Sequence, residues 1–400
     1  MHNKPTRLLL NIGHALDHMF LLIFATAVTS IAQDFQLQHW EDLMPYSVAA
    51  FFFFGLGSIP AGKLGDVWGR RPMMLVFFMG IGLASIAVAF TQTPLQLAFA
   101  LALLGCMASI YHPVGIPMLV QGVPRPGWTI GVNGLAGNLG LAMAAAVTGL
   151  LMKYFGWRMA FVMPGVVSIL CGVAFAYWAT PETQAPAKQP KADSPHTNFP
   201  VKKLLIMMTL ASTTGGMLFN FSTNSNFELL THKFAAIFQD PAKIGFCLAL
   251  VYVLASFAQL VVGYCLDRMG LKPLFQTVIA LQITALALAL FSDGWWFYAA
   301  QLLFMAAIFG AVPFADAMIV RYVDNRMRSR IAGLRLAIAL GVSSLAVGLI
   351  GPVVKASGFG TLIAVMLVTA CLTFTVASFL PHAPAAVSPR ARGGSNAASS

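Results

Sequence analysis

Charged residues are scarce in this sequence. Asp, Glu, Lys and Arg together make up 9% of its 400 residues, whereas soluble domains average about 25%. So few charges cannot provide a polar surface around a globule of this length. Hydrophobic residues supply 58% of the chain, and the mean hydropathy is +0.78. The composition therefore excludes a soluble globular domain and predicts an integral membrane protein.

Acidic residues are fewer still. There are 13 Asp and Glu against 24 Lys and Arg, which gives a net charge of +11. An excess of this size can indicate nucleic-acid binding. Here, however, the basic residues fall in short stretches between long apolar segments, as they do in membrane proteins. We therefore expect a lipid bilayer, and no nucleic acid, as the partner.

Paired cysteines are absent. The five cysteines lie in or at the ends of apolar segments, and none belongs to a Cys-x-x-Cys motif. The sequence also has no Walker loop, no metal-ligand spacing and no supported Ser-His-Asp arrangement. We therefore expect no disulfide framework, no bound metal, no cofactor and no enzymatic activity.

Long apolar segments are abundant. A membrane-spanning helix needs about 20 apolar residues. Twelve segments reach about that length: 8–32, 44–63, 73–91, 94–120, 128–152, 158–180, 201–226, 243–265, 272–291, 295–320, 330–354 and 358–380. A stretch rich in Pro, Lys and Ala separates the sixth from the seventh. The pattern predicts an all-α membrane fold of twelve transmembrane helices in two six-helix bundles, 1–180 and 201–381, with a cytoplasmic linker at 181–200 and a disordered cytoplasmic tail at 382–400.

The basic residues also predict the orientation. If the N-terminus lies in the cytoplasm, 18 of the 24 Lys and Arg fall on the cytoplasmic side, five fall outside, and Arg335 falls within a helix. Cytoplasmic loops of membrane proteins carry such an excess. We therefore expect a multi-pass protein of the inner membrane with both termini in the cytoplasm.

A short basic turn lies between the second and third apolar segments, and a weaker copy recurs 201 residues later. The matching residues are Gly62, Asp66, Gly69, Arg70 and Arg71 in the first copy and Gly263, Asp267, Arg268, Gly270 and Lys272 in the second. A repeat at half-length indicates a duplicated transporter; an ordinary Gly-containing turn with basic flanks is the alternative. The first copy resembles motif A of the major facilitator superfamily, which joins helices 2 and 3 of those transporters. The resemblance implies two bundles related by a pseudo-two-fold axis along the membrane normal.

In such a fold Asp66 would face the first turn of segment 330–354. The positive dipole end of that helix attracts a carboxylate, so we expect Asp66 to hold the cytoplasmic side closed when the two bundles meet there. Asp267 is expected to do the same, more weakly, at the start of segment 128–152.

Polar residues interrupt the first apolar segment. Asn11, His14, Asp17 and His18 fall within an arc of about 120° on a helix, so they share one face. A carboxylate deep in a membrane helix is costly, and such residues are functional candidates. Since His titrates near neutral pH, we take His14, Asp17 and His18 as candidates for proton coupling and Asn11 as a cavity residue. A purely structural polar cluster is the alternative.

The fourth apolar segment contains Tyr111, His112 and Pro113. Pro113 frees a carbonyl group in the preceding turn, which membrane helices tolerate where they line a cavity or are buried in protein. We expect His112 to lie at a depth similar to that of Asp17 and to take part in proton coupling, with Tyr111 in the cavity; a packing histidine is the alternative. Together with 13–18, the basic turn and 156–158, this segment resembles the fosmidomycin-resistance-like branch of the superfamily. Its members are predicted efflux carriers, so the resemblance implies efflux without identifying the substrate.

Segments 128–152 and 201–226 hold weaker candidates. Four glycines recur every three residues in the first, which favours close helix packing, and Asn138 lies among them as a cavity candidate. Segment 201–226 is too polar to face lipid, so we expect Asn220 and Asn224 to line the cavity. An early helix end with a polar outer loop is the alternative.

Two charged residues lie near the cytoplasmic ends of later segments. Asp316 in 295–320 is a cavity candidate, although it could simply pair with Arg321 or Arg335. Arg335 in 330–354 could extend to the cytoplasm or meet an anionic substrate.

These features predict secondary active transport of a small molecule across the inner membrane by alternating access. Proton-coupled efflux is the expected mode, small molecules and protons are the expected partners, and a monomer is the expected form. Uptake of a small metabolite by symport or uniport uses the same fold and stays an alternative. A membrane assembly or sensor protein that has lost transport is the other.

Overall fold

The computed structural model describes residues 3–121, 123–124, 126–179, 201–266, 268–322 and 328–380, and it describes side chains there except at 126–127, 201–204, 316, 319–322 and 328–336. The predicted linker 181–200, the predicted tail 382–400 and Asp267 lie outside these residues.

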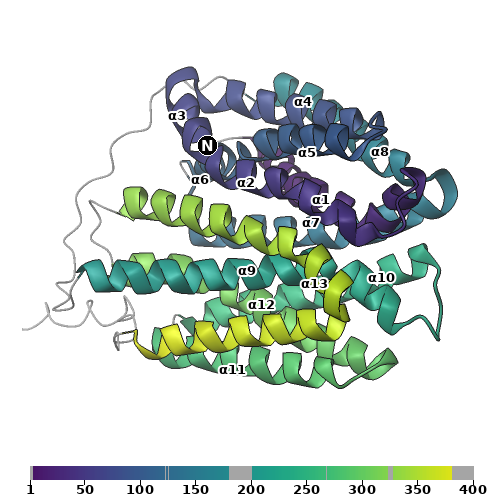
Figure 1. Cartoon of the computed structure of the whole chain (residues 1–400). Helices are drawn as coiled ribbons and strands as arrows, with labels where there is room; N and C mark the ends of the chain where they lie inside the picture. Colours follow the sequence, from purple (N-terminus) through teal and green to yellow (C-terminus); the bar gives the residue numbers. More distant parts are fainter. Residues whose placement is uncertain are drawn as a thin grey trace, which may run out of the picture.

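The first half of the chain forms one group of helices, and the second half forms another (Figure 1). The elements of the first half are α1 (Lys4–Asp34), η1 (Trp40–Ser47), α2 (Val48–Leu56), α3 (Ser58–Trp68), α4 (Arg70–Ala89), α5 (Pro94–Ala108), η2 (Tyr111–Gly115), α6 (Ile116–Val120), α7 (Pro126–Phe155) and α8 (Trp157–Trp178). Those of the second half are α9 (Val201–Lys233), α10 (Pro241–Leu266), α11 (Leu271–Leu290), α12 (Gly294–Tyr322) and α13 (Arg328–Ser378).

The described helices account for the predicted membrane crossings. Nine stretches are long and apolar enough to span a bilayer, and the bent pair Trp40–Leu56 and Ser58–Trp68 makes a tenth. Helix α9 has 33 residues and lies among these spans, although its polar composition sets it apart. Helix α13 breaks at Gly358, where φ is 76°, and so supplies two crossings. With α9 added and α13 counted twice, the predicted twelve-helix, all-α membrane fold is confirmed.

The basic turn is shorter than the sequence predicted. Helix α3 continues through Gly62 and Asp66 to Trp68, so most of this stretch is helical and the prediction of a turn across it is wrong. The chain reverses at Gly69, whose φ of 97° lies in the left-handed region that favours glycine. The next helix begins immediately afterwards at Arg70.

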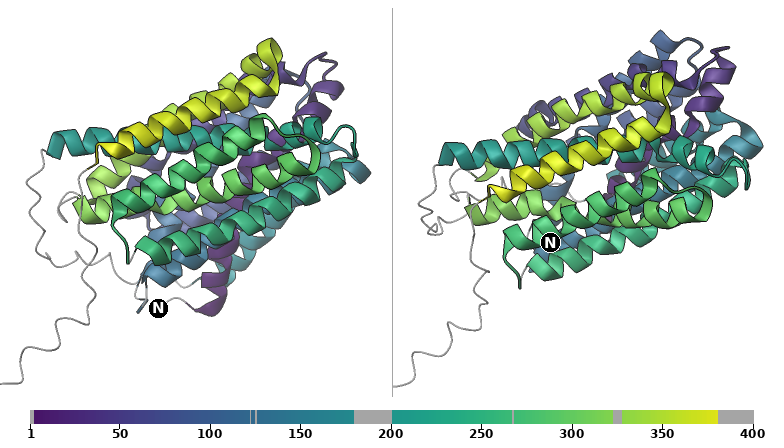
Figure 2. Two further views of the ribbon diagram at one scale, coloured as in Figure 1. Left: turned by 90° about the horizontal axis from the view of Figure 1, so that it is seen from below. Right: turned by 60° about the horizontal axis from the view of Figure 1, so that its bottom comes forward.

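Polar contacts link the two halves at one end of the molecule, which we call the Asp42 end. Lys355 of α13 donates to both carboxylate oxygens of Asp42 in η1, at 2.6 and 2.8 Å. Lys153 of α7 pairs with Asp240, which precedes α10, and this hydrogen bond lowers the pKa of Asp240. We call the opposite end, where α3 turns into α4, the Gly69 end. Figure 2 shows the long helices of both halves running between these two ends.

Candidate functional site: a central cavity with a histidine wall

A cavity of about 330 Å³ lies between the two halves. Helices α1, α2 and α7 and the element η2 line it from one side, and α9 to α13 line it from the other. Its walls are mostly apolar or weakly polar, with Phe51, Phe54 and Phe219 among the aromatic side chains. Among the described residues that line it, none is Asp, Glu, Lys or Arg, and the ionisable side chains are those of three histidines.

His14, His18 and His112 form this histidine cluster on the wall of the first half. His14 and His18 are one turn apart on α1, and their ring centroids are 4.7 Å apart. The His112 ring lies 5.1 Å from that of His14 and 5.7 Å from that of His18. One nitrogen from each ring lies within 4.8 Å of the others. The cluster therefore joins one face of α1 to a residue from a distant part of the sequence.

A local break in the fourth span places His112 there. The chain forms a π-helical turn at Tyr111–Gly115, between α5 and α6. Pro113 lacks an N–H group and cannot continue an α-helical ladder, and such π-turns within helices are frequent at functional sites. This turn lies where the sequence predicted a proline-induced break.

Asp17 lies behind the histidine cluster rather than in the cavity wall. Its side chain is 0% exposed, and Oδ2 is 3.6 Å from Nε2 of His112. Neither carboxylate oxygen has a hydrogen-bond partner among the described residues. A buried carboxylate without a hydrogen bond is unfavourable unless it is neutralised or balanced by a positive charge.

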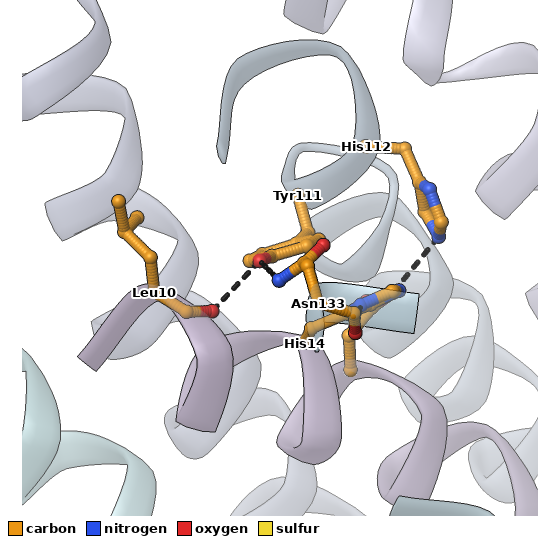
Figure 3. Close-up of polar contacts among 6 residues, drawn as sticks. Leu10, His14, Tyr111, His112 and Asn133 are labelled. Atoms are coloured by element: carbon orange, nitrogen blue, oxygen red, sulfur yellow. Dashed lines mark hydrogen bonds and ion pairs between the residues drawn. The ribbon is translucent and has the colours of Figure 1, made fainter. Parts of the chain in front are cut away.

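A hydrogen-bond network supports His14 from behind (Figure 3). The Tyr111 hydroxyl donates to the backbone oxygen of Leu10 at 2.7 Å and accepts from Nδ2 of Asn133 at 2.8 Å. Nδ2 of Asn133 is also 2.9 Å from Oδ1 of Asn11. The Tyr111 ring stacks on His14, with centroids 4.8 Å apart and an interplanar angle of 11°. Asn11 and Tyr111, predicted to face the cavity, thus lie behind its wall.

The backbone oxygen of Asn133 sets the orientation of the His14 ring. It lies 2.6 Å from Nδ1 of His14. Because a carbonyl oxygen only accepts hydrogen bonds, Nδ1 must carry the proton and Nε2 keeps its lone pair in the neutral ring. The sequence did not identify Asn133 as a site residue, because its main contribution comes from the backbone.

The second half supplies polar groups through α9. Asn220 lines the cavity and donates through Nδ2 to the backbone oxygen of Ser343 at 3.0 Å. Asn224 is buried outside the lining and donates to the backbone oxygen of Asn220 at 3.1 Å. Helix α9 continues to Lys233, so the alternative of an early helix end is wrong.

Other candidates divide between the cavity and the rest of the molecule. Asn138 lines the cavity, and its Nδ2 donates to Oε1 of Gln259 across the two halves at 2.8 Å. Asp316 and Arg335 belong to α12 and α13, but their side chains lie outside the described part of the chain.

Both arginines of the basic turn donate to backbone oxygens of their own half. Arg71 donates to the backbone oxygens of Ala179 and Ala176 at the end of α8, at 2.6 and 2.7 Å. Arg70 donates to the backbone oxygen of Pro117 at 3.2 Å. Asp66 is exposed at the Gly69 end.

The first glycine of the motif has different surroundings in the two copies. A Cβ on Gly62 would lie 3.3 Å from Pro113, whereas a Cβ on Gly263 would meet no atom within 4 Å. Arg268 donates to the backbone oxygen of Tyr264, on the preceding helix, at 3.1 Å.

Comparison with known proteins identifies relatives. The family model of the Major Facilitator Superfamily matches residues 10–235. The "Multidrug resistance protein MdtG" of Escherichia fergusonii is 24% identical over 344 residues, which cover 84% of this chain and 82% of the relative. The protein of that name from Enterobacter lignolyticus is 24% identical over 302 residues, which cover 74% of this chain and 71% of the relative.

Solved structures share the fold. A bacterial homolog to the human lysosomal transporter Spinster, in an inward-facing and unoccupied conformation, superposes with a TM-score of 0.75 at 13% identity and covers 94% of this chain and 98% of its own. The nucleoside transporter NupG gives a TM-score of 0.72 at 15% identity and covers 93% and 98%. At these identities the likeness concerns the fold alone.

Proposed function

This chain belongs to the Major Facilitator Superfamily, and we propose that it exports small molecules through the central cavity in exchange for protons. Membership makes it a multi-pass membrane transporter rather than an enzyme. Export is supported by the multidrug resistance proteins among its relatives. The observation that carries the proposal is a cavity between two helical halves with a buried carboxylate, Asp17, directly behind its histidine wall.

The contacts between the halves support alternating access. The halves 1–180 and 201–381 act as the two moving bodies, and the Asp42 end is closed by the Lys355–Asp42 and Lys153–Asp240 pairs. With the Gly69 end in the cytoplasm of the cell, as the distribution of basic residues favours, this arrangement corresponds to a carrier closed to the outside. The chain acts as a monomer in the inner membrane.

Opening to the outside requires the Gly69 end to close. Asp66, at the end of α3 that faces this side, then meets the positive dipole end of α13. Its exposure in the present arrangement is consistent with a contact that forms only in the other state.

Proton coupling is assigned to Asp17 with His14, His18 and His112. Asp17 has no exposed surface and no hydrogen-bond partner among the described residues, so a proton or a nearby positive charge removes the cost of burying its charge. His112 lies between Asp17 and the cavity and connects the two. In this scheme substrate and proton compete, because both bind at the histidine wall of the cavity.

Reconstituted vesicles provide the test. The wild type is expected to accumulate compounds from a chemically diverse panel when a pH gradient is imposed in the export direction. Asp17→Asn is expected to abolish gradient-driven accumulation while exchange of substrate across the membrane persists.

Asp34→Asn is the matched control, because Asp34 ends the same helix and pairs at the surface with Arg158 at 2.8 Å. Full gradient-driven accumulation by a correctly inserted Asp17→Asn protein would remove Asp17 from the coupling mechanism. Accumulation driven in the import direction would instead identify an uptake carrier.

A further inference from the structure

We propose that the histidine cluster binds a divalent transition-metal cation, which the transporter carries as cargo. This inference rests on the proposed function and names a substrate class for the same cavity. It arises from the convergence of His14, His18 and His112, which the sequence alone did not indicate as a metal site.

The distances within the cluster suit a small cation after modest adjustment. Zinc–imidazole bonds of about 2.0–2.1 Å in a tetrahedral site place the ligand nitrogens about 3.3 Å apart. The three nitrogens now lie within 4.8 Å of one another. His18 and His112 are only half-buried and line the cavity, so their rings can rotate toward a cation and a cation can reach them.

His14 already has the arrangement of a metal ligand. Histidines that bind metals usually donate their second ring N–H to a backbone carbonyl or a carboxylate, which orients the ring. Nδ1 of His14 makes this bond to the backbone oxygen of Asn133. Its Nε2 is buried without a hydrogen-bond partner in the described part of the chain, and so is Nε2 of His18. The two unpartnered nitrogens are the donor atoms that a cation needs.

Asp17 supplies the negative charge. Its carboxylate is fully buried, lies 3.6 Å from His112, and has two oxygens without partners among the described residues. A cation held by the three imidazoles would lie on the other side of His112 from Asp17 and balance its charge from there. Alternatively, the carboxylate would bind the cation directly as a fourth ligand. Either arrangement neutralises the charge of a carboxylate that accepts no hydrogen bond from the described residues.

The donor set selects the class of cation. Imidazole nitrogen suits Zn²⁺, Co²⁺, Ni²⁺ and Cu²⁺, whereas Mg²⁺ and Ca²⁺ require several oxygen ligands. The described lining of the cavity offers no carboxylate, which disfavours the alkaline-earth ions.

Metal binding is tested on the full chain, purified in detergent with an affinity tag that contains no histidine. Titration with Co²⁺ is expected to give one site per chain and the visible absorption bands of a four-coordinate ion. His112→Gln, which changes a half-buried side chain, is expected to weaken binding at least 10-fold, and His14→Gln is the second variant. His39→Gln and His232→Gln change exposed histidines elsewhere and serve as matched controls.

Transport of the metal is tested separately with Zn²⁺ flux in reconstituted vesicles. Wild-type flux that His112→Gln abolishes supports the proposal. Absence of a Co²⁺ site, or equal affinity in wild type and His112→Gln, overturns it, and binding without flux overturns the role as cargo. Gradient-driven export of an organic compound by a protein that binds no metal would leave the proposed function intact and reject only this inference.

Discussion

The crossing of α1 and α7 offers a sharp test of how this fold is packed. At Gly140 the two backbones are so close that an added Cβ would lie 2.1 Å from the backbone oxygen of Ala15. Ordinary van der Waals contact begins near 3.4 Å, so Gly140→Ala forces the helices apart by about an ångström. Gly131, nine residues earlier on the same helix, has no atom within 4 Å of its would-be Cβ.

The expected magnitudes follow from two opposing effects. Overpacking a tight contact costs about 1–3 kcal/mol, and the upper part of that range applies because the obstacle is backbone rather than a flexible side chain. Replacing Gly by Ala within a helix stabilises the folded state by up to about 1 kcal/mol, because Ala has the higher helix propensity. Gly140→Ala should therefore lose about 2 kcal/mol, roughly a 30-fold change in the folding equilibrium. Gly131→Ala should be neutral or stabilised by up to about 1 kcal/mol.

Thermal stability of the purified protein in one detergent measures the difference. After heating to a series of temperatures, the fraction that stays monodisperse should fall at a lower temperature for Gly140→Ala than for the wild type, and Gly131→Ala should match or exceed the wild type. If Gly140→Ala melts at or above Gly131→Ala, the close approach of α1 and α7 is not a feature of the folded protein, and the position of the histidine cluster loses its support.

Three further changes test the gates and the cluster. Lys355→Met removes an exposed ion pair with Asp42, worth about 0.2–1 kcal/mol. In a protein that carries Thr223→Cys in the cavity lining and Ser at its five native cysteine positions, it should increase thiol labelling from the Asp42 end by at most about 5-fold; unchanged labelling would show that the pair does not hold this end closed. Asp66→Asn should leave the Gly69 end open for longer, so labelling of the same introduced cysteine from that end should increase and transport should slow. Transport and labelling equal to those of the wild type would contradict the gating role of Asp66. Gly137→Ala places a Cβ 2.7 Å from the His14 ring. The displaced ring should weaken Co²⁺ binding while the protein stays folded. Unchanged binding would show that His14 adapts freely or does not bind the metal.

The class of protein and its helices could be predicted from the sequence because hydropathy is a local property. Each span needs about 20 apolar residues of its own to replace contact with water by contact with lipid, and no distant residue alters that requirement. The family was also predicted correctly, since the basic turn at Gly62–Arg71 is a local pattern. Its conformation was not, because α3 extends to Trp68 and only Gly69 turns.

The site depended on how the helices rotate and pack against one another. The periodicity of α1 placed Asn11, His14, Asp17 and His18 on one face, but the tertiary structure divides that face, with His14 and His18 in the cavity wall and Asp17 behind it.

The contacts that complete the cluster come from other spans. His112 reaches it through the π-turn at Tyr111–Gly115, and the Asn133 oxygen that orients His14 is a backbone atom of α7. The sequence alone determined that this chain crosses the membrane as a two-part transporter. Only the tertiary structure decided that three histidines meet. Pro113 marks the break beside His112 in the sequence, but helix rotation and the close approach of α1 and α7 at Gly140 bring the three rings together, and both depend on residues far apart in the chain.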